Sequence, residues 1–299
     1  NGLRVAPPTS SARGNSFYAE KAMSDLQFPG LYIGEAADLR PALPSLVRCG
    51  YYALVMAADV SESGTKYGRQ YYDYNCGTLI CRHPDAAYAG LPASCLWAVA
   101  FHPDLFEGCV QEKRAEEYTF FSYAPAEALH VSCEERRILT SCFDDLRREL
   151  RHGADRYTRA ILTRHIIRLL DYTTRFYERQ FITRNTANEA LVWEYEAFAD
   201  RYLADGKWAI RGPLTAARCA ERLRLSEAYF EDLLEQELGH THHCHMQLRR
   251  IEIAKRKLRL SQEPLCQIVR ELGFPSVQYF GFLFKKMTGL SPGEYKRIN

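Results

Sequence analysis

The sequence predicts an α+β protein with more than one domain, in which a β-rich N-terminal part precedes an all-helical C-terminal part. Three observations support this fold class: short β-prone runs over residues 17–125, a change to helical periodicity near Ser132, and a helix-turn-helix pattern that occurs twice after Gly212. The 299 residues fit about two domains at roughly 100–200 residues each. A composition of 46% hydrophobic and 25% charged residues is typical of globular proteins and excludes a largely disordered chain.

Short β-prone runs separated by Gly, Pro, Asp and Ser make up the first part of the chain. The runs are Tyr51–Met56, Gln70–Tyr74, Thr78–Cys81 and Cys95–Phe101. Several short strands at this spacing are typical of an all-β sandwich or barrel. Because strands and helices do not alternate, a Rossmann-like enzyme is disfavoured.

Three amphipathic helices are expected after the β region. Ser132 followed by acidic residues is a helix start, since a Ser cap and early carboxylates suit the positive end of a helix. Asp155 can cap a second helix, and a third is expected from Thr186 to Leu203. The first two form an αα-hairpin. Part of its apolar surface is predicted to face a second subunit; the alternative is that it packs only on its own β domain.

The C-terminal part contains an internal repeat. Ser226 and Ser276 each cap a helix, and Gly239 and Gly289 each follow 13 residues later. Aromatic and leucine positions between them match as well, as in Tyr229-Phe230 and Tyr279-Phe280. Gly273 permits a left-handed turn between the two helices of the second copy. The repeat predicts two helix-turn-helix units.

A single connecting helix, Thr241–Leu260, is expected between the two copies. About 20 residues at 1.5 Å each span ~30 Å. One turn of DNA is ~34 Å, so two recognition helices at that separation could enter successive major grooves.

Residues 212–299 resemble the DNA-binding domain of AraC/XylS-type bacterial transcription regulators. The resemblance rests on Ile268–Phe274, Ser276–Phe280, Leu283–Lys286 and Gly289–Tyr295. The upstream part is similar to family members, common in Bacteroidetes, that have an N-terminal cupin-like β-barrel and a helical dimerisation hairpin; there the similarity lies in Phe101–Leu105, Tyr118–Tyr123 and Phe176–Phe181.

The resemblance implies three regions and a function. They are a cupin-like β-barrel sensor (17–131), a helical dimerisation and linker region (132–205) and an AraC-type DNA-binding domain (206–299). The expected function is sequence-specific regulation of transcription at promoter DNA by a homodimer that responds to a small-molecule effector and works with RNA polymerase. The expected location is the cytoplasm, in association with the nucleoid. No enzymatic activity, cofactor or membrane association is expected.

Position within the family's motifs also implies which residues contact DNA. In the first unit they are Ser226, Glu227, Ala228, Glu231 and Asp232, and in the second Ser276, Val277, Gln278, Gly281 and Phe282. Arg249, Arg250, Lys285 and Lys286 are expected at the phosphates. Gln278 could pair with adenine and Phe282 could contact a thymine methyl group.

The first recognition helix departs from the family because it carries five acidic residues and no Lys or Arg. Carboxylates are repelled by phosphates, although one can accept a hydrogen bond from cytosine. This leaves a second possibility, a protein-interaction module whose helices have lost DNA affinity. A third possibility is a metal-dependent cupin enzyme, but His83, His102 and His130 form no H-x-H pair.

Several further features could have either a functional role or a purely structural one. Tyr71, Tyr72, Tyr74, Trp97 and Phe101 could line an effector pocket or form ordinary core. His242 and His245 could share a helix face as metal ligands, but a solvated helix start is favoured. The ten cysteines form no C-x-x-C pair, and we expect them to be reduced thiols of a cytosolic chain. No apolar run is long enough to span a membrane.

The net charge of +2 hides an asymmetry along the chain. Residues 1–132 carry 10 basic and 14 acidic groups, whereas residues 212–299 carry 14 basic and 10 acidic groups. The modest basic excess at the C-terminal end predicts weak, salt-sensitive DNA contact by each subunit, strengthened by pairing of subunits.

Overall fold

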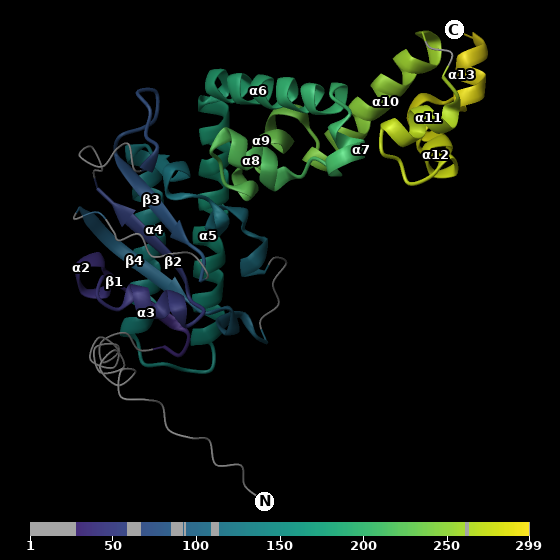
Figure 1. The fold of residues 1–299 in the computed structure, drawn as a ribbon. Helices are drawn as coiled ribbons and strands as arrows, with labels where there is room; N and C mark the ends of the chain where they lie inside the picture. Colours follow the sequence, from purple (N-terminus) through teal and green to yellow (C-terminus); the bar gives the residue numbers. More distant parts are fainter. Residues whose placement is uncertain are drawn as a thin grey trace, which may run out of the picture. The chain divides into compact units, whose positions relative to one another are not determined.

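The computed structural model describes residues 28–58, 67–84, 92, 94–108, 114–260 and 263–298 (Figure 1). Contacts divide the chain into two compact units, Asn1–Arg184 and Asn185–Asn299. The helix expected at 186–203 therefore belongs to the second unit and does not group with the hairpin that precedes it.

A five-stranded antiparallel sheet forms the centre of the first unit. Its strands are β1 (Leu31–Glu35), β2 (Tyr52–Ala57), β3 (Gly77–Arg82), β4 (Cys95–Phe101) and β5 (Leu129–Val131), in the order β1-β4-β2-β3-β5. Tyr52 pairs with Phe101, and Ala53 with Arg82. The α+β class is confirmed. The described strands form one sheet with β1 and β5 at its edges, and a closed cupin-like barrel stays a prediction.

Both faces of this sheet are covered, which explains why β2 and β3 are buried along their whole length. Helices α2 (Ala36–Leu39) and α3 (Leu43–Arg48) share one apolar cluster with Val55, Ile80 and Ala98. On the other face Trp97 stacks on Phe143 of α4, with ring centroids 5.2 Å apart. Short 3-10 helices, η2 (Pro103–Phe106), η3 (Ala115–Glu117), η4 (Thr119–Ser122) and η5 (Pro125–Glu127), complete the unit.

The predicted helical hairpin is confirmed as α4 (Cys133–Arg151) and α5 (Thr158–Thr183), which pack against each other. Ser132 and Glu135 form a capping box at the start of α4. Asp155 accepts hydrogen bonds from the backbone N–H groups of Tyr157 and Thr158 just before α5. Arg179 of α5 binds Glu135 of α4 through two nitrogens, at 2.9 and 2.8 Å, which fixes the two helices in register.

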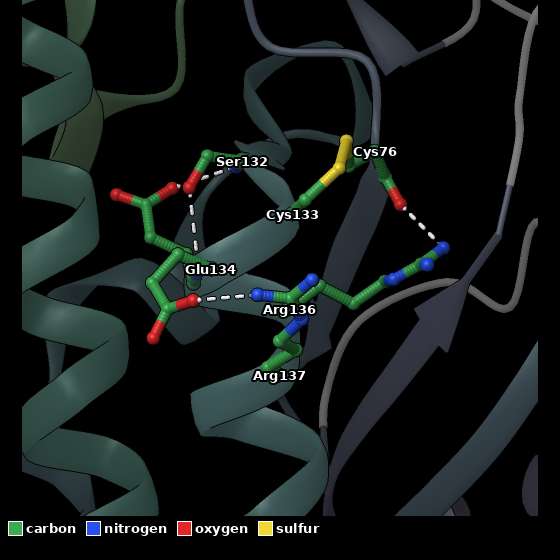
Figure 2. Close-up of a disulfide and its surroundings, with 7 residues drawn as sticks. Cys76, Ser132, Cys133, Glu134, Arg136 and Arg137 are labelled. Atoms are coloured by element: carbon green, nitrogen blue, oxygen red, sulfur yellow. Dashed lines mark hydrogen bonds and ion pairs between the residues drawn. A yellow bond between two sulfur atoms is a disulfide. The ribbon is translucent and has the colours of Figure 1, made fainter.

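Cys76 and Cys133 form a disulfide, with their Cα atoms 5.0 Å apart (Figure 2). Cys76 precedes β3 and Cys133 is the first residue of α4, so the bond ties the start of β3 to the start of the hairpin. Arg136 donates to the Cys76 carbonyl at 2.8 Å (Figure 2). The expectation of reduced thiols is wrong for this pair. The other described cysteines are free.

The second unit is entirely helical in its described residues. Helices α6 (Asn185–Ala204), α7 (Lys207–Arg211), α8 (Ala216–Leu223) and α9 (Glu227–Leu238) lead into the long α10 (His242–Leu260). Helices α11 (Leu265–Glu271), α12 (Val277–Thr288) and α13 (Pro292–Ile298) follow. Helix α10 confirms the predicted connecting helix.

Helix α10 joins two separate apolar cores, so the second unit has two lobes (Figure 1). Met246, near its start, packs with Tyr195 of α6 and Phe230 of α9. Ile251 and Leu258, further along, pack with α11 and α12. The first lobe therefore contains α6, α8 and α9, and the second contains α11, α12 and α13. No described helix has the length and apolar character needed to cross a membrane.

Candidate nucleic-acid interface

Each lobe presents one helix with the features of a DNA-recognition helix. Ser226 accepts a hydrogen bond from the N–H of Tyr229 at 3.2 Å and so caps α9. Ser276 caps α12 in the same way, with the N–H of Tyr279 at 3.0 Å. Gly239 and Gly289 end the two helices in the left-handed conformation. The repeat seen in the sequence is therefore confirmed as two equivalent helix-turn-helix units.

The outer face of α12 is open and carries donors. Val277, Gln278 and Phe282 are exposed, and the Phe282 side chain is 69% accessible although it is large and apolar. Lys285 and Lys286 are exposed in the last turn, and Gly281 between them and the cap is half-buried. The helix contains no acidic residue. It can therefore approach phosphates without repulsion and present an amide and an apolar ring to base edges.

Helix α9 has the opposite electrostatic character. Its residues include Glu227, Glu231, Asp232, Glu235 and Glu237 and no basic side chain. Glu231 is half-buried and accepts a hydrogen bond from the backbone N–H of His242 at 3.0 Å, so it caps the start of α10. Glu237 accepts a hydrogen bond from Asn188 at 3.0 Å. Two of the five carboxylates thus hold the first lobe together.

The predicted phosphate contacts on α10 differ in position. Arg249 binds both carboxylate oxygens of Asp200 on α6 and lies at the surface. Arg250 is buried, with 7% of its surface exposed, and its Nε donates to the carbonyl of Leu272 at 2.8 Å. The prediction that Arg250 contacts phosphate is therefore wrong for this structure, because its guanidinium points into the domain.

The Arg250 guanidinium lies between two aromatic rings. Its central carbon is 4.3 Å from the centroid of Trp208 and 3.8 Å from that of Phe274. Burial lowers its pKa to about 10, which leaves it charged at neutral pH. Sequence reasoning missed Trp208, because this residue follows the Asp205-Gly206 break and belongs to neither predicted helix.

The five aromatic residues predicted to line an effector pocket are not brought together. Tyr71 is 97% exposed and Tyr74 is also exposed, whereas Trp97 and Phe101 are core residues. Trp97 packs on α4 and donates to Thr140 at 3.2 Å, and Phe101 stacks on Tyr52. Tyr72 is half-buried beside Tyr71. This site prediction is wrong, because Trp97 and Phe101 are buried in the core whereas Tyr71 and Tyr74 are exposed.

His242 has a structural role. One ring nitrogen lies 3.0 Å from the hydroxyl of Tyr195 and the other 2.7 Å from the carbonyl of Leu214. His245 is also buried, 3.8 Å from the carboxylate of Glu196. Within the described residues, no group of three or more His, Cys, Asp or Glu side chains could hold a metal ion.

Comparison with known proteins links the second lobe, together with α9 and the end of α8 in the first, to one family. Residues 219–298 match the model of a helix-turn-helix domain family. The chain is 33% identical over 95 residues to the arabinose operon regulatory protein of Escherichia coli, which covers 32% of this chain and 30% of that protein. It is 31% identical over 72 residues to the probable transcriptional regulator LumQ of Photobacterium leiognathi, which covers 24% of this chain and 29% of that protein.

Among solved structures, the chain is similar to the C-terminal domain of AraT from Geobacillus stearothermophilus. The two sequences are 27% identical, and the TM-score is 0.32, with 36% of this chain and 85% of that chain covered. The chain spans less than a third of the length of the two curated relatives. The C-terminal unit therefore carries a helix-turn-helix domain. This domain is of the AraC type, and its homologues are AraC/XylS-family regulators.

Proposed function

We propose that this chain is a transcription regulator that binds double-stranded promoter DNA with α12 as its main reading helix. The observation that carries the proposal is the exposed face of α12, which combines a Ser-capped start, Gln278 and two lysines without any carboxylate. Helix α9 carries five carboxylates, which repel the phosphates of DNA. Both helices would face DNA, but the second lobe would supply most of the base contacts.

Selection of bound DNA fragments by the full chain tests this proposal. The selected sequence should contain adenine where Gln278→Ala relaxes the preference, at a cost of about 1–3 kcal/mol in discrimination. The control is Gln236→Ala on α9, an exposed glutamine that should leave the preference unchanged. An unchanged preference in Gln278→Ala, or no selection at all at low salt, would contradict the proposal.

Salt dependence separates the roles of the lysines from that of the amide. Lys285→Ala should weaken binding to all fragments alike and reduce the slope of log affinity against log salt by about 1. A slope equal to that of the unmodified chain would show that Lys285 does not neutralise a phosphate.

We further propose that the chain acts as a cytoplasmic homodimer responsive to a small molecule, together with RNA polymerase. The modest charge of the reading domain supports pairing of subunits, which the predicted 132–205 region would mediate. Sedimentation of the full chain tests it, because a monomer at micromolar concentration contradicts it.

The first unit offers a candidate effector site in place of the five aromatic residues. A cavity of about 450 Å³ is lined by Tyr51, His102, Asp104 and Arg159, among others. Its mixed aromatic and charged wall suits a polar small molecule. His102→Ala should abolish the response of DNA binding to such an effector while DNA affinity itself is retained.

A second candidate function is a protein-interaction module, favoured by the acidic face of α9. In that case the chain would bind a partner protein and not DNA, and Glu227→Lys with Glu235→Lys would abolish the partner binding. If DNA binding falls steeply with salt and these changes strengthen it, this alternative is excluded.

A further inference from the structure

The second unit contains a cavity of about 280 Å³ at the place where its two lobes meet α10. Trp208 and Leu214 come from the segment that leads into the first lobe, Met246 and Arg250 come from α10, and Tyr279 comes from α12. The cavity is therefore bordered by elements of both lobes, including the first turn of the proposed reading helix.

The wall of this cavity is apolar with a single permanent charge. Trp208, Leu214 and Met246 supply an apolar surface, and no Asp or Glu occurs among the described lining residues. His242 also lines the cavity, but both of its ring nitrogens are occupied by Tyr195 and Leu214. Arg250 is therefore the charged group that a ligand would meet.

Arg250 has hydrogen-bonding capacity that the protein does not use. Its Nε donates to Leu272, while its Nη2 is buried and has no acceptor among the described residues. The aromatic faces of Trp208 and Phe274 stabilise the cation but accept no conventional hydrogen bond from Nη2. A buried donor without an acceptor is costly, so a ligand that supplies one gains affinity.

Tyr279 gives a second indication that the cavity is open to a ligand. In the internal repeat it corresponds to Tyr229, which is 3% exposed, yet Tyr279 is 43% exposed and lines the cavity. The tyrosine at this position is thus buried in the first lobe and accessible in the second.

We propose that this cavity binds a small monocarboxylate with a flat apolar body, the carboxylate pairing with Arg250 and the body packing against Trp208 and Met246. A carboxylate matches the guanidinium in charge and in geometry. Such a ligand would connect α10 with the start of α12 and so change the affinity of α12 for DNA. Binding itself is independent of DNA, whereas the effect on DNA rests on the function proposed above.

Calorimetric titration of the full chain with benzoate, in the absence of DNA, tests the binding step. Benzoate should bind one molecule per chain, and benzamide, its neutral analogue of similar shape, should bind at least about tenfold more weakly, equivalent to 1.4 kcal/mol. Equal affinity for the two probes, or no benzoate binding at millimolar concentration, would overturn the proposal.

Two variants locate the site. Arg250→Met should lose benzoate binding; since this change affects a packed residue, its fold is checked by circular dichroism. Gln247→Trp blocks the cavity from α10 without removing a buried group, and it should weaken benzoate binding at least about tenfold. Gln236→Trp, on α9 and outside the cavity, is the matched control and should bind benzoate normally. Unchanged binding in Gln247→Trp would place the ligand elsewhere and overturn the assignment.

The DNA arm is measured separately on a fragment selected by the chain. Saturating benzoate should change the affinity of the unmodified chain for that fragment and leave the affinity of Gln247→Trp unchanged. A chain that binds benzoate but no DNA contradicts the proposed function and leaves the cavity assignment intact. A chain that binds both independently overturns the coupling.

Discussion

Arg224 and Gly273 occupy the same backbone position in the turns of the two lobes. Arg224 has φ 59° and Gly273 has φ 66°, so both lie in the left-handed region. In each turn the following residue donates its N–H to the carbonyl five positions earlier, at 2.9 Å in the first lobe and 3.0 Å in the second. The two turns thus share one helix-ending motif, but the first lobe makes it with a residue that has a Cβ atom.

Replacing Arg224 with glycine should stabilise the first lobe. A non-glycine residue in the left-handed conformation costs roughly 1–2 kcal/mol, and glycine removes this cost. Part of the gain is offset because glycine increases the conformational entropy of the unfolded chain. We expect Arg224→Gly to raise the free energy of unfolding by about 0.5–1 kcal/mol in urea titrations. Arg222→Gly, within α8, is the control and should lower it by about 1 kcal/mol.

Replacing Gly273 with alanine should have a large opposite effect. A Cβ atom there would lie 2.0 Å from Cδ1 of Trp208, in addition to the strain of the left-handed backbone. We expect Gly273→Ala to cost more than about 2 kcal/mol, measured by urea unfolding. Gly239→Ala has a similar φ with open space around it, so it should cost only about 1 kcal/mol. Equal costs would show that Trp208 moves freely.

The ion pair between Asp73 and Arg184 is buried, and breaking it should destabilise the first unit strongly. Two nitrogens of Arg184 donate to the two oxygens of Asp73, at 3.0 and 2.7 Å. Asp73→Asn leaves the arginine buried without a countercharge, at a cost of about 3–5 kcal/mol in the free energy of unfolding. In contrast, Asp205→Asn breaks the exposed pair with Lys207 and should cost less than about 1 kcal/mol.

His130 should make stability depend on pH. Burial lowers its pKa from 6.5 to about 4, helped by Arg184 and opposed by Asp73. Between pH 6.5 and about 4, His130 is therefore protonated in the unfolded chain but not in the folded chain. Its contribution to stability is complete above pH 6.5 and is lost as the pH falls, by about 2 kcal/mol at pH 5.

Urea unfolding at pH 7 and pH 5 measures this contribution. His130→Gln should reduce the difference in unfolding free energy between the two pH values by about 2 kcal/mol. His243→Gln, at an exposed position, should leave the difference as it is. An equal pH dependence in both variants would show that His130 is protonated as easily in the folded chain as in the unfolded one.

Local signals in the sequence predicted the starts of helices well, but the expected strand at Gln70–Tyr74 is wrong, because these residues lie in a turn. Ser132, Ser226 and Ser276 cap helices as expected, because a cap depends on a few neighbouring residues. The helical region was also divided correctly into two repeated units. The cupin-like closure of the sheet stays a prediction. Closure depends on pairing between strands that are far apart in the chain, and local signals do not specify such pairing.

The candidate site was predicted less completely, because side-chain environment depends on distant partners. Arg249 and Arg250 are neighbours of one type, yet the first binds Asp200 at the surface and the second lies between Trp208 and Phe274. Spacing along α10 does not distinguish them without the position of Trp208. Tyr71 and Phe101 differ for the same reason, one lying in an exposed loop and the other at the centre of the sheet unit.

The disulfide between Cys76 and Cys133 turns that stretch of chain into a covalent ring that contains β3, β4 and β5. Cleavage of one peptide bond within the ring leaves the two fragments joined. A chain cut there by a protease would keep its full mass under oxidising conditions and separate into two pieces only after a reductant is added. Integrity of the backbone and integrity of the molecule are therefore different properties in this part of the protein.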